Sequence, residues 1–200
     1  MSPIISRDSI QSEIKQQLLE SARVKEALAA GCSDSIADAA ELLIATVAEG
    51  AKILLCGNGG SAADAQHIAA ELVARLKKER VAIPALALTT NTSTITALAN
   101  DYDFLKVFTR QVEAFGRPGD VLIGISTSGN SKNVIQAMNY AAENGLKTVV
   151  LTGGNGGEMA QIANVSIIVP SDSVQRIQES HIAIGHILCD LLEQSVSNQK

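Results

Sequence analysis

Five short apolar runs constrain the fold of this chain more than any other feature of its sequence. None of them alternates apolar with polar residues, and they occupy 52–56, 85–88, 120–125, 147–151 and 165–169. Uninterrupted apolar strands are typical of parallel sheets that are covered on both faces. Most of these runs are followed by a loop rich in Gly, Ser, Thr or Asn and then by a helical stretch. The pattern predicts an α/β fold with a doubly wound, five-stranded parallel sheet flanked by helices.

Helical patterns precede and follow the sheet region. Residues 7–28 form an N-terminal helical arm with one apolar stripe, which consists of Ile10, Ile14, Leu18 and Leu19. A second helix is predicted from Ser35 to Glu49, with Ser35 as its N-cap. The stretch from Val174 to Ser195 is predicted to be one long helix.

No linker, repeat or low-complexity tract divides the 200 residues, so a single domain is expected. We divide residues 1–200 into N-terminal helices in 1–50, an α/β sheet core in 51–170 and a C-terminal helix in 174–196.

Composition excludes several classes of protein. Aromatic residues make up only 2% of the chain, so the core must be built from Ala, Ile, Leu and Val. The net charge of −5, with scattered Lys and Arg, argues against a nucleic-acid partner. The three cysteines lack the spacing of a disulfide framework, which favours a reducing compartment. The chain shows neither a secretory signal nor an apolar run of roughly 20 residues, so we expect a cytoplasmic protein without a membrane partner.

Three glycine-rich loops follow predicted strands, at the sheet edge where α/β proteins bind ligands. The loops are GNGGS at 57–61, STSGNS at 126–131 and TGGNGG at 152–157. Glycines let a ligand approach the backbone, hydroxyl groups donate hydrogen bonds, and a helix N-terminus attracts an anion. The first two loops are therefore candidate phosphate sites, although a single loop of this kind is equally typical of a turn or helix cap. The third has fewer hydroxyl groups, and we interpret it as structural.

Nucleotide-binding motifs fit these loops poorly. A P-loop requires Lys after its last glycine, and Gly60 is followed by Ser61. Gly57, Gly59 and Ala62 match the spacing of a dinucleotide-binding loop, but the acidic residue expected about 20 positions later is missing. A nucleotide-dependent enzyme is thus the weakest of the functional hypotheses.

The three histidines of the chain fall in two predicted helices. His67 and Glu71 are spaced i, i+4 and share a helix face, where they could bind Zn²⁺. His181 and His186 lie in the last helix, near Gln178. Gln178 and His186 are eight residues apart, about 12 Å along a helix axis, so His181 is the nearer partner. The spacing alone does not choose between the two histidines, and isolated core or surface histidines remain an alternative.

Four stretches occur in an order that resembles the phosphoheptose isomerases of the sugar-isomerase (SIS) family of phosphosugar-binding proteins. They are CGNGGSAADAQHIAAEL, ALANDY, GDVLIGISTSGNSKNVIQA and RIQESHIAIGHILCDLLE. The resemblance runs from about residue 8 to 196. It implies a SIS-type sheet of flavodoxin-like strand order. It also implies conversion of sedoheptulose 7-phosphate to D-glycero-D-manno-heptose 7-phosphate through an enediol, the first step of ADP-heptose biosynthesis for lipopolysaccharide core or another surface glycan.

The resemblance also implies roles for individual residues. One Zn²⁺ per subunit would be bound by His67, Glu71, Gln178 and His186, which favours His186 over His181. Glu71 and His186 would also be the catalytic acid–base pair. The substrate would be bound by Asn58, Gly59, Gly60, Ser61, Glu71, Arg75, Asn100, Asp101, Ser126, Thr127, Ser128, Ser131 and Gln178. The family implies a homotetramer with active sites at subunit interfaces.

A non-catalytic relative is the alternative within this family. The replication-initiator-associating protein shares the fold and the phosphosugar loops but acts as a regulator. In that branch the glutamate and the last histidine of the metal site are missing, whereas Glu71 and His186 are both present here. The enzyme is therefore the preferred hypothesis.

Overall fold

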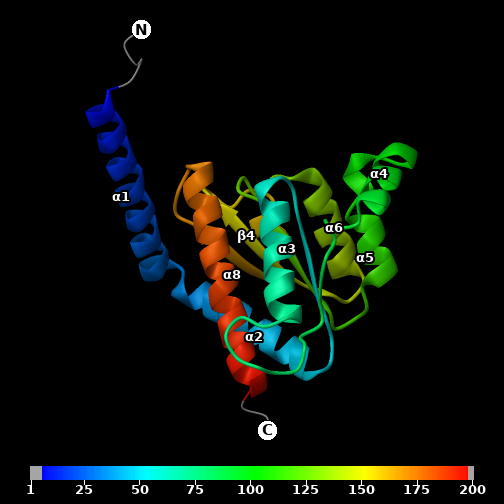
Figure 1. Cartoon of the computed structure of the whole chain (residues 1–200). Helices are drawn as coiled ribbons and strands as arrows, with labels where there is room; N and C mark the ends of the chain where they lie inside the picture. Colours follow the sequence, from blue (N-terminus) through cyan, green and yellow to red (C-terminus); the bar gives the residue numbers. More distant parts are fainter. Residues whose placement is uncertain (1–5, 198–200) are drawn as a thin grey trace.

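The five apolar runs form the five strands of one parallel sheet (Figure 1). The computed structural model describes residues 6–197, so residues 1–5 and 198–200 of the expected domain lie outside the described part. The strands are β1 (Ile53–Gly57), β2 (Ala85–Ala87), β3 (Val121–Ile125), β4 (Lys147–Gly153) and β5 (Val165–Val169). Their order is β2-β1-β3-β4-β5 and all neighbouring pairs are parallel. The predicted fold class and strand order are confirmed.

The strand register brings the glycine-rich loops to one edge of the sheet. Gly57 at the end of β1 pairs with Ile125 at the end of β3, and Ile125 pairs with Leu151 of β4. The loops that follow β1, β3 and β4 therefore leave the sheet at nearly the same level. Chain order reverses between β1 and β3, which is the position where open α/β sheets bind ligands.

Helices cover both faces of the sheet because alternate strand residues point into two different apolar cores. Ile53 and Ile123 belong to the core beneath α2 (Ser33–Ala48), α3 (Gly60–Val73) and α8 (Val174–Ser197). Leu54 and Leu122 belong to the core beneath the helices of the opposite face. Those helices are α4 (Thr92–Asp101), η1 (Phe104–Lys106), α5 (Thr109–Phe115), α6 (Lys132–Glu143) and α7 (Met159–Ile162).

The N-terminal arm is helix α1 (Arg7–Gly31), which reaches beyond the sheet layers (Figure 1). Leu28 is the one residue of this helix that is buried within the described chain. The predicted apolar stripe is present but exposed, and its leucine at position 18 is 66% accessible. No helix within residues 6–197 combines the length and the apolar character needed to cross a membrane.

The predicted N-cap at Ser35 is wrong. Helix α2 begins at Ser33, and the residue at its N-cap position is Cys32. Ser35 lies inside the first turn, where its hydroxyl donates to the carbonyl oxygen of Cys32 at 3.0 Å. A helix can therefore begin two residues earlier than the serine that best matches the capping preference, because α1 ends immediately before it and Ser33 also bonds back to Ala29.

Candidate active site and metal centre

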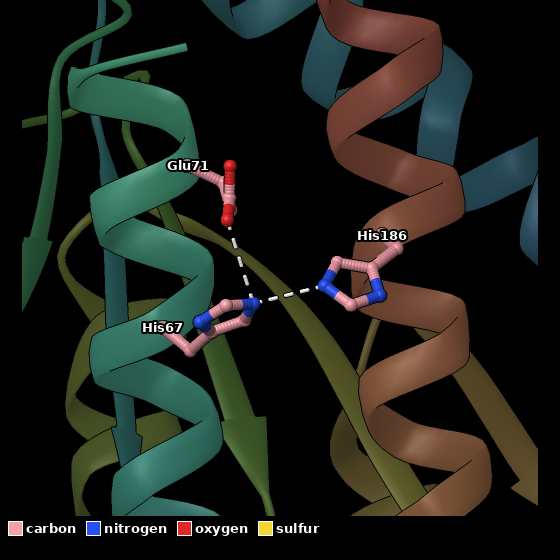
Figure 2. A group of neighbouring side chains, drawn as sticks. All are labelled: His67, Glu71 and His186. Carbon is pink, nitrogen blue, oxygen red and sulfur yellow. Dashed lines mark hydrogen bonds and ion pairs between the residues drawn. The ribbon is translucent and has the colours of Figure 1, made fainter. Parts of the chain in front are cut away.

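His67, Glu71 and His186 meet between helices α3 and α8 (Figure 2). His67 Nε2 lies 2.8 Å from His186 Nε2 and 3.5 Å from Glu71 Oε1. One ligand atom from each residue lies within 4.8 Å of the other two. The two imidazole rings meet edge to face, with 5.1 Å between their centroids. The sequence spacing brought His67 and Glu71 together on one helix, and the fold adds His186 from 119 residues further along the chain.

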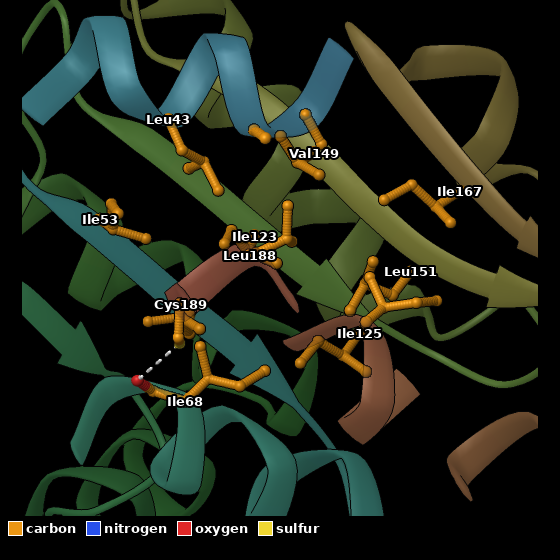
Figure 3. Packing of buried hydrophobic residues seen from close by; sticks show 14 of the residues in the cluster. Leu43, Ile53, Ile68, Ile123, Ile125, Val149, Leu151, Ile167, Leu188 and Cys189 are labelled. Atoms are coloured by element: carbon orange, nitrogen blue, oxygen red, sulfur yellow. Dashed lines mark hydrogen bonds between the residues drawn. The ribbon is translucent and has the colours of Figure 1, made fainter. Parts of the chain in front are cut away.

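Close packing of α3 against α8 holds this cluster together. A Cβ atom on Gly185 would lie 2.6 Å from Cδ1 of Ile68, so only glycine permits this approach without displacing Ile68. Beneath the contact, Ile68, Leu188 and Cys189 are buried in the core (Figure 3). Ile68 directly follows His67, and Gly185 directly precedes His186. Their contact therefore sets the separation of the two imidazoles.

The donor set fits a zinc ion. Two imidazoles and a carboxylate are common ligands of catalytic zinc, which retains an open position for water or substrate. A tetrahedral Zn²⁺ with bonds of about 2.0–2.2 Å keeps its ligand atoms roughly 3.3–3.6 Å apart. The separations of 2.8 and 3.5 Å lie close to that range, and all three ligand atoms lie within 4.8 Å of one another. The His67 side chain is 46% exposed and that of Glu71 is 22% exposed, which leaves an approach for a ligand.

His181 is a core histidine and lies outside the His67–Glu71–His186 cluster. It is fully buried, and its Nε2 lies 3.0 Å from the carbonyl oxygen of Thr152. Burial lowers the pKa of His181 to about 4, although the bond to Thr152 acts in the opposite direction. His186, in contrast, is exposed on the face of α8 that meets His67. The structure thus places His186 in the cluster and His181 inside the protein.

Gln178 lies beside the first glycine-rich loop. A Cβ atom on Gly60 would lie 2.5 Å from Gln178 Nε2, so the amide packs directly against the backbone at the start of α3. Gly60 and His67 are seven residues apart, about 10 Å along the axis of α3. Within one chain the Gln178 side chain therefore contacts the GNGGS loop. Its role as a metal ligand stays a prediction.

The GNGGS loop is connected to the first turn of α6 through a pair of amides. Asn58 Nδ2 donates to Asn133 Oδ1, and Asn133 Nδ2 donates to Asn58 Oδ1, both at 2.9 Å. Gly59 has a φ of +56°, a conformation that favours glycine. Ser61 is buried at the N-terminus of α3. The sequence analysis missed Asn133, and its position two residues after the STSGNS motif, at the start of a predicted helix, was the available signal.

The STSGNS loop borders a cavity of about 350 Å³. Thr127 and Ser128 line it, whereas Ser126 is buried and its Oγ lies 2.9 Å from Ser131 Oγ. The remaining lining residues come from the third loop and the start of α8, and they are Gly153, Gly154, Asn155, Asp172, Val174 and Ile177. The TGGNGG loop therefore lines the same cavity as the STSGNS loop, which the sequence did not indicate. It also packs tightly, since a Cβ on Gly129 would lie 2.0 Å from the carbonyl oxygen of Gly156.

Comparisons with known proteins give this geometry a family context. The SIS domain family matches residues 18–153. The chain is 55% identical over 184 residues to the phosphoheptose isomerase of Aquifex aeolicus, covering 92% of this chain and 96% of that protein. It is 52% identical over 188 residues to the enzyme of Geotalea daltonii, covering 94% of this chain and 98% of that protein.

The chain belongs to the SIS family, within its phosphoheptose isomerase branch.

Solved structures agree with this assignment. Phosphoheptose isomerase GmhA from Neisseria gonorrhoeae superposes with a TM-score of 0.87 at 44% identity, covering 92% of this chain and 99% of that one. The isomerase from Francisella tularensis has a TM-score of 0.89 at 38% identity, covering 92% and 98%. The sugar isomerase domain of an RpiR transcription factor from Sphaerobacter thermophilus, with a TM-score of 0.65 at 20% identity, shares the fold alone.

Three predicted substrate residues of this SIS isomerase make their side-chain contacts outside the cluster in the described chain. Arg75 is exposed and pairs with Glu79 at 2.8 Å. Asn100 donates to Asp101 Oδ1 at 2.8 Å at the exposed end of α4. Helix α4 packs on the opposite face of the sheet from α3 and α8. Participation of Asn100 and Asp101 in the same site stays a prediction, which requires a neighbouring subunit to bring them close.

Proposed function

We propose that this isomerase converts sedoheptulose 7-phosphate to D-glycero-D-manno-heptose 7-phosphate by moving a proton between C1 and C2 through an enediol. The observation that supports it is the His67–Glu71–His186 cluster, located along α3 from a glycine- and hydroxyl-rich loop. A general acid and base on either side of a sugar chain are the groups that an aldose–ketose exchange requires.

The loops bind the phosphate end of the substrate. The N-terminus of α3, the hydroxyls of Thr127 and Ser128 and the glycine backbone supply donors without bulk. The axial distance of about 10 Å from Gly60 to His67 is comparable to the reach of an extended seven-carbon sugar phosphate. Holding the phosphate fixes the reacting carbons near the cluster, which lowers the entropic cost of orientation.

Glu71 and His186 carry the protons in this proposal. One Glu71 oxygen faces His67 and the other points away from it (Figure 2), so the second oxygen is available to move the proton between C1 and C2. His186 exchanges protons with the sugar oxygens. A Zn²⁺ held by His67, Glu71 and His186, with Gln178 as a fourth ligand, would supply Lewis-acid polarisation of the substrate carbonyl.

Assembly and location complete the proposal. We expect a homotetramer, because the stripe on α1 is apolar and exposed and because Asn100 and Asp101 lie far from the cluster in one chain. Its site would then form at a subunit interface.

The three free cysteines are buried, which supports a reducing, cytoplasmic compartment. The product would enter heptose synthesis for lipopolysaccharide core or another surface glycan.

The decisive experiment is incubation of the full-length protein with sedoheptulose 7-phosphate, with product identified by NMR. We expect conversion by the zinc-loaded protein, loss of conversion after chelator treatment, and recovery when zinc is returned. Binding of the sugar phosphate without turnover in the zinc-loaded protein would contradict the enzyme and favour the phosphosugar-binding regulator. Conversion that is insensitive to chelator would contradict the metal-assisted mechanism alone.

A further inference from the structure

A buried ion pair lies just beyond the metal cluster, at the point where the loop after α3 meets α8. Its members are Arg80 and Glu193, whose side chains are 2% and 1% exposed. Arg80 Nε lies 3.6 Å from Glu193 Oε2. Neither residue faces the cavity beside the STSGNS loop or belongs to the predicted acid–base pair. Burial of two charges is costly unless their polar atoms form hydrogen bonds.

Glu193 fixes the loop that follows α3. Its two carboxylate oxygens accept hydrogen bonds from the backbone amides of Leu76, Lys77 and Lys78 at 2.9, 2.8 and 2.7 Å. Burial alone would raise the pKa of the Glu193 carboxyl, but these amides together with Arg80 hold it below its ordinary value. The carboxylate is therefore ionised at neutral pH, and it binds the loop to α8 through charge-assisted hydrogen bonds.

Arg80 fixes the end of α3 itself. Its Nη2 donates to the carbonyl oxygen of Glu71 at 2.8 Å, and its Nη1 donates to the carbonyl oxygen of Ala74 at 3.3 Å. The last carbonyls of a helix have no partner within the helix, and a cation there is also favoured by the helix dipole. The guanidinium thus holds the backbone of Glu71, whose side chain belongs to the cluster.

The pair therefore touches both helices that supply the cluster. Arg80 holds α3 at Glu71, and Glu193 is seven residues after His186 on α8, two turns along the same face. The Gly185–Ile68 contact sets the separation of the helices at the level of the imidazoles. The Arg80–Glu193 pair is a second connection between α3 and α8, beyond the cluster.

We propose that Arg80 and Glu193 are positioning residues that hold α3 and α8 at the separation and rotation needed for His67, Glu71 and His186 to bind one metal ion. This inference rests on the metal-binding part of the proposed function. Residues behind metal ligands commonly change metal affinity by about 10- to 100-fold when they are altered. We expect an effect of that size when the Arg80–Glu193 pair is disrupted.

Cobalt(II) titration of the metal-free protein, followed by visible absorption, tests the proposal without relying on isomerase activity. We compare wild type with Glu193→Gln, which keeps the size and one acceptor oxygen but removes the charge. Asp120→Asn is the matched control, because Asp120 is also a buried carboxylate that accepts two backbone amides and pairs with a cation, Lys52, at the amino-terminal edge of β3.

The expected result is an affinity for Co²⁺ at least about 10-fold weaker in Glu193→Gln, with an altered absorption band, and unchanged affinity in Asp120→Asn. Equal affinity and identical spectra in wild type and Glu193→Gln would overturn the inference while leaving the metal site intact. Absence of Co²⁺ binding by wild type would refute the metal site of the proposed function and the inference with it. Equal weakening in both variants would show a general effect of lost stability and would also overturn it.

Hydrogen exchange on the wild-type protein keeps the test independent of variant folding. Coupling between sites is reciprocal, so metal binding should slow exchange of the amides of Leu76, Lys77 and Lys78. The amides of Lys52 and Arg117, which bond to Asp120, serve as the internal reference and should not change. Unchanged exchange at 76–78 on metal binding would contradict the proposed role.

Discussion

The buried histidine of α8 gives the sharpest test of the packing described above. His181 donates from Nε2 to the carbonyl oxygen of Thr152, and its Nδ1 has no hydrogen-bond partner among the described residues. Protonation of Nδ1 would place an unpaired N–H and a positive charge inside the core, which is strongly unfavourable. We therefore predict that acidification destabilises the fold specifically through His181.

The size of the effect follows from the pKa. Burial lowers the pKa of His181 from 6.5 to about 4, and a difference of about 2.5 corresponds to roughly 3 kcal/mol. The unfolded chain binds the extra proton between pH 6.5 and 4, whereas the folded chain does not. The contribution of His181 to the free energy of unfolding is therefore fully present above pH 6.5 and is lost as the pH falls toward 4.

Urea unfolding at pH 7, 5.5 and 4.5 measures this contribution in wild type and His181→Gln. Glutamine retains a donor for Thr152 but does not titrate. Both proteins are kept at one concentration and in chelator, so that titration of His67 and His186 affects them equally. We expect the stability difference between wild type and variant to shift by about 2–3 kcal/mol in favour of the variant as the pH falls. Parallel pH profiles for the two proteins would refute the reasoning.

Other predictions concern the cluster and its surroundings. Glu71→Gln and His186→Gln should each lower kcat by at least about 100-fold with unchanged circular dichroism, and near-normal turnover in either would remove its assigned role. Ser128→Ala should chiefly raise KM in steady-state kinetics, since it removes a donor from the phosphate loop; an unchanged KM would contradict phosphate binding there. Gly185→Ala should force Ile68 aside, lower the melting temperature and weaken Co²⁺ binding, whereas wild-type Co²⁺ affinity would show that the helices do not need this close contact.

The apolar runs predicted the sheet well because parallel strands that are buried on both faces consist almost entirely of apolar residues. The strands β1 and β3 are buried at every position, so no solvent-facing residue interrupts their apolar runs. Helix boundaries were harder to predict from the sequence. Ser35 matched the preference for a cap, yet α2 begins at Ser33, because the ends of a helix depend on the chain before it as well as on its own first residue.

Only part of the candidate site could be predicted from the sequence. The spacing of His67 and Glu71 is a local property of one helix, so it could be predicted. The choice between His181 and His186 depends on the rotation of α8 against the sheet, which spacing does not contain. The resemblance to a family supplied that choice, and the burial of His181 explains it. Asn133, Arg80 and Glu193 act through contacts across 75 to more than 100 residues, which no local pattern reveals.

The amide pair between Asn58 and Asn133 has a consequence for how this sequence can vary. Each side chain offers the other one donor and one acceptor. Asp at either position would place two acceptor oxygens opposite each other. An aliphatic side chain at either position would leave the remaining amide partly buried and without its hydrogen-bond partner. The two positions are therefore expected to change together or not at all among natural variants.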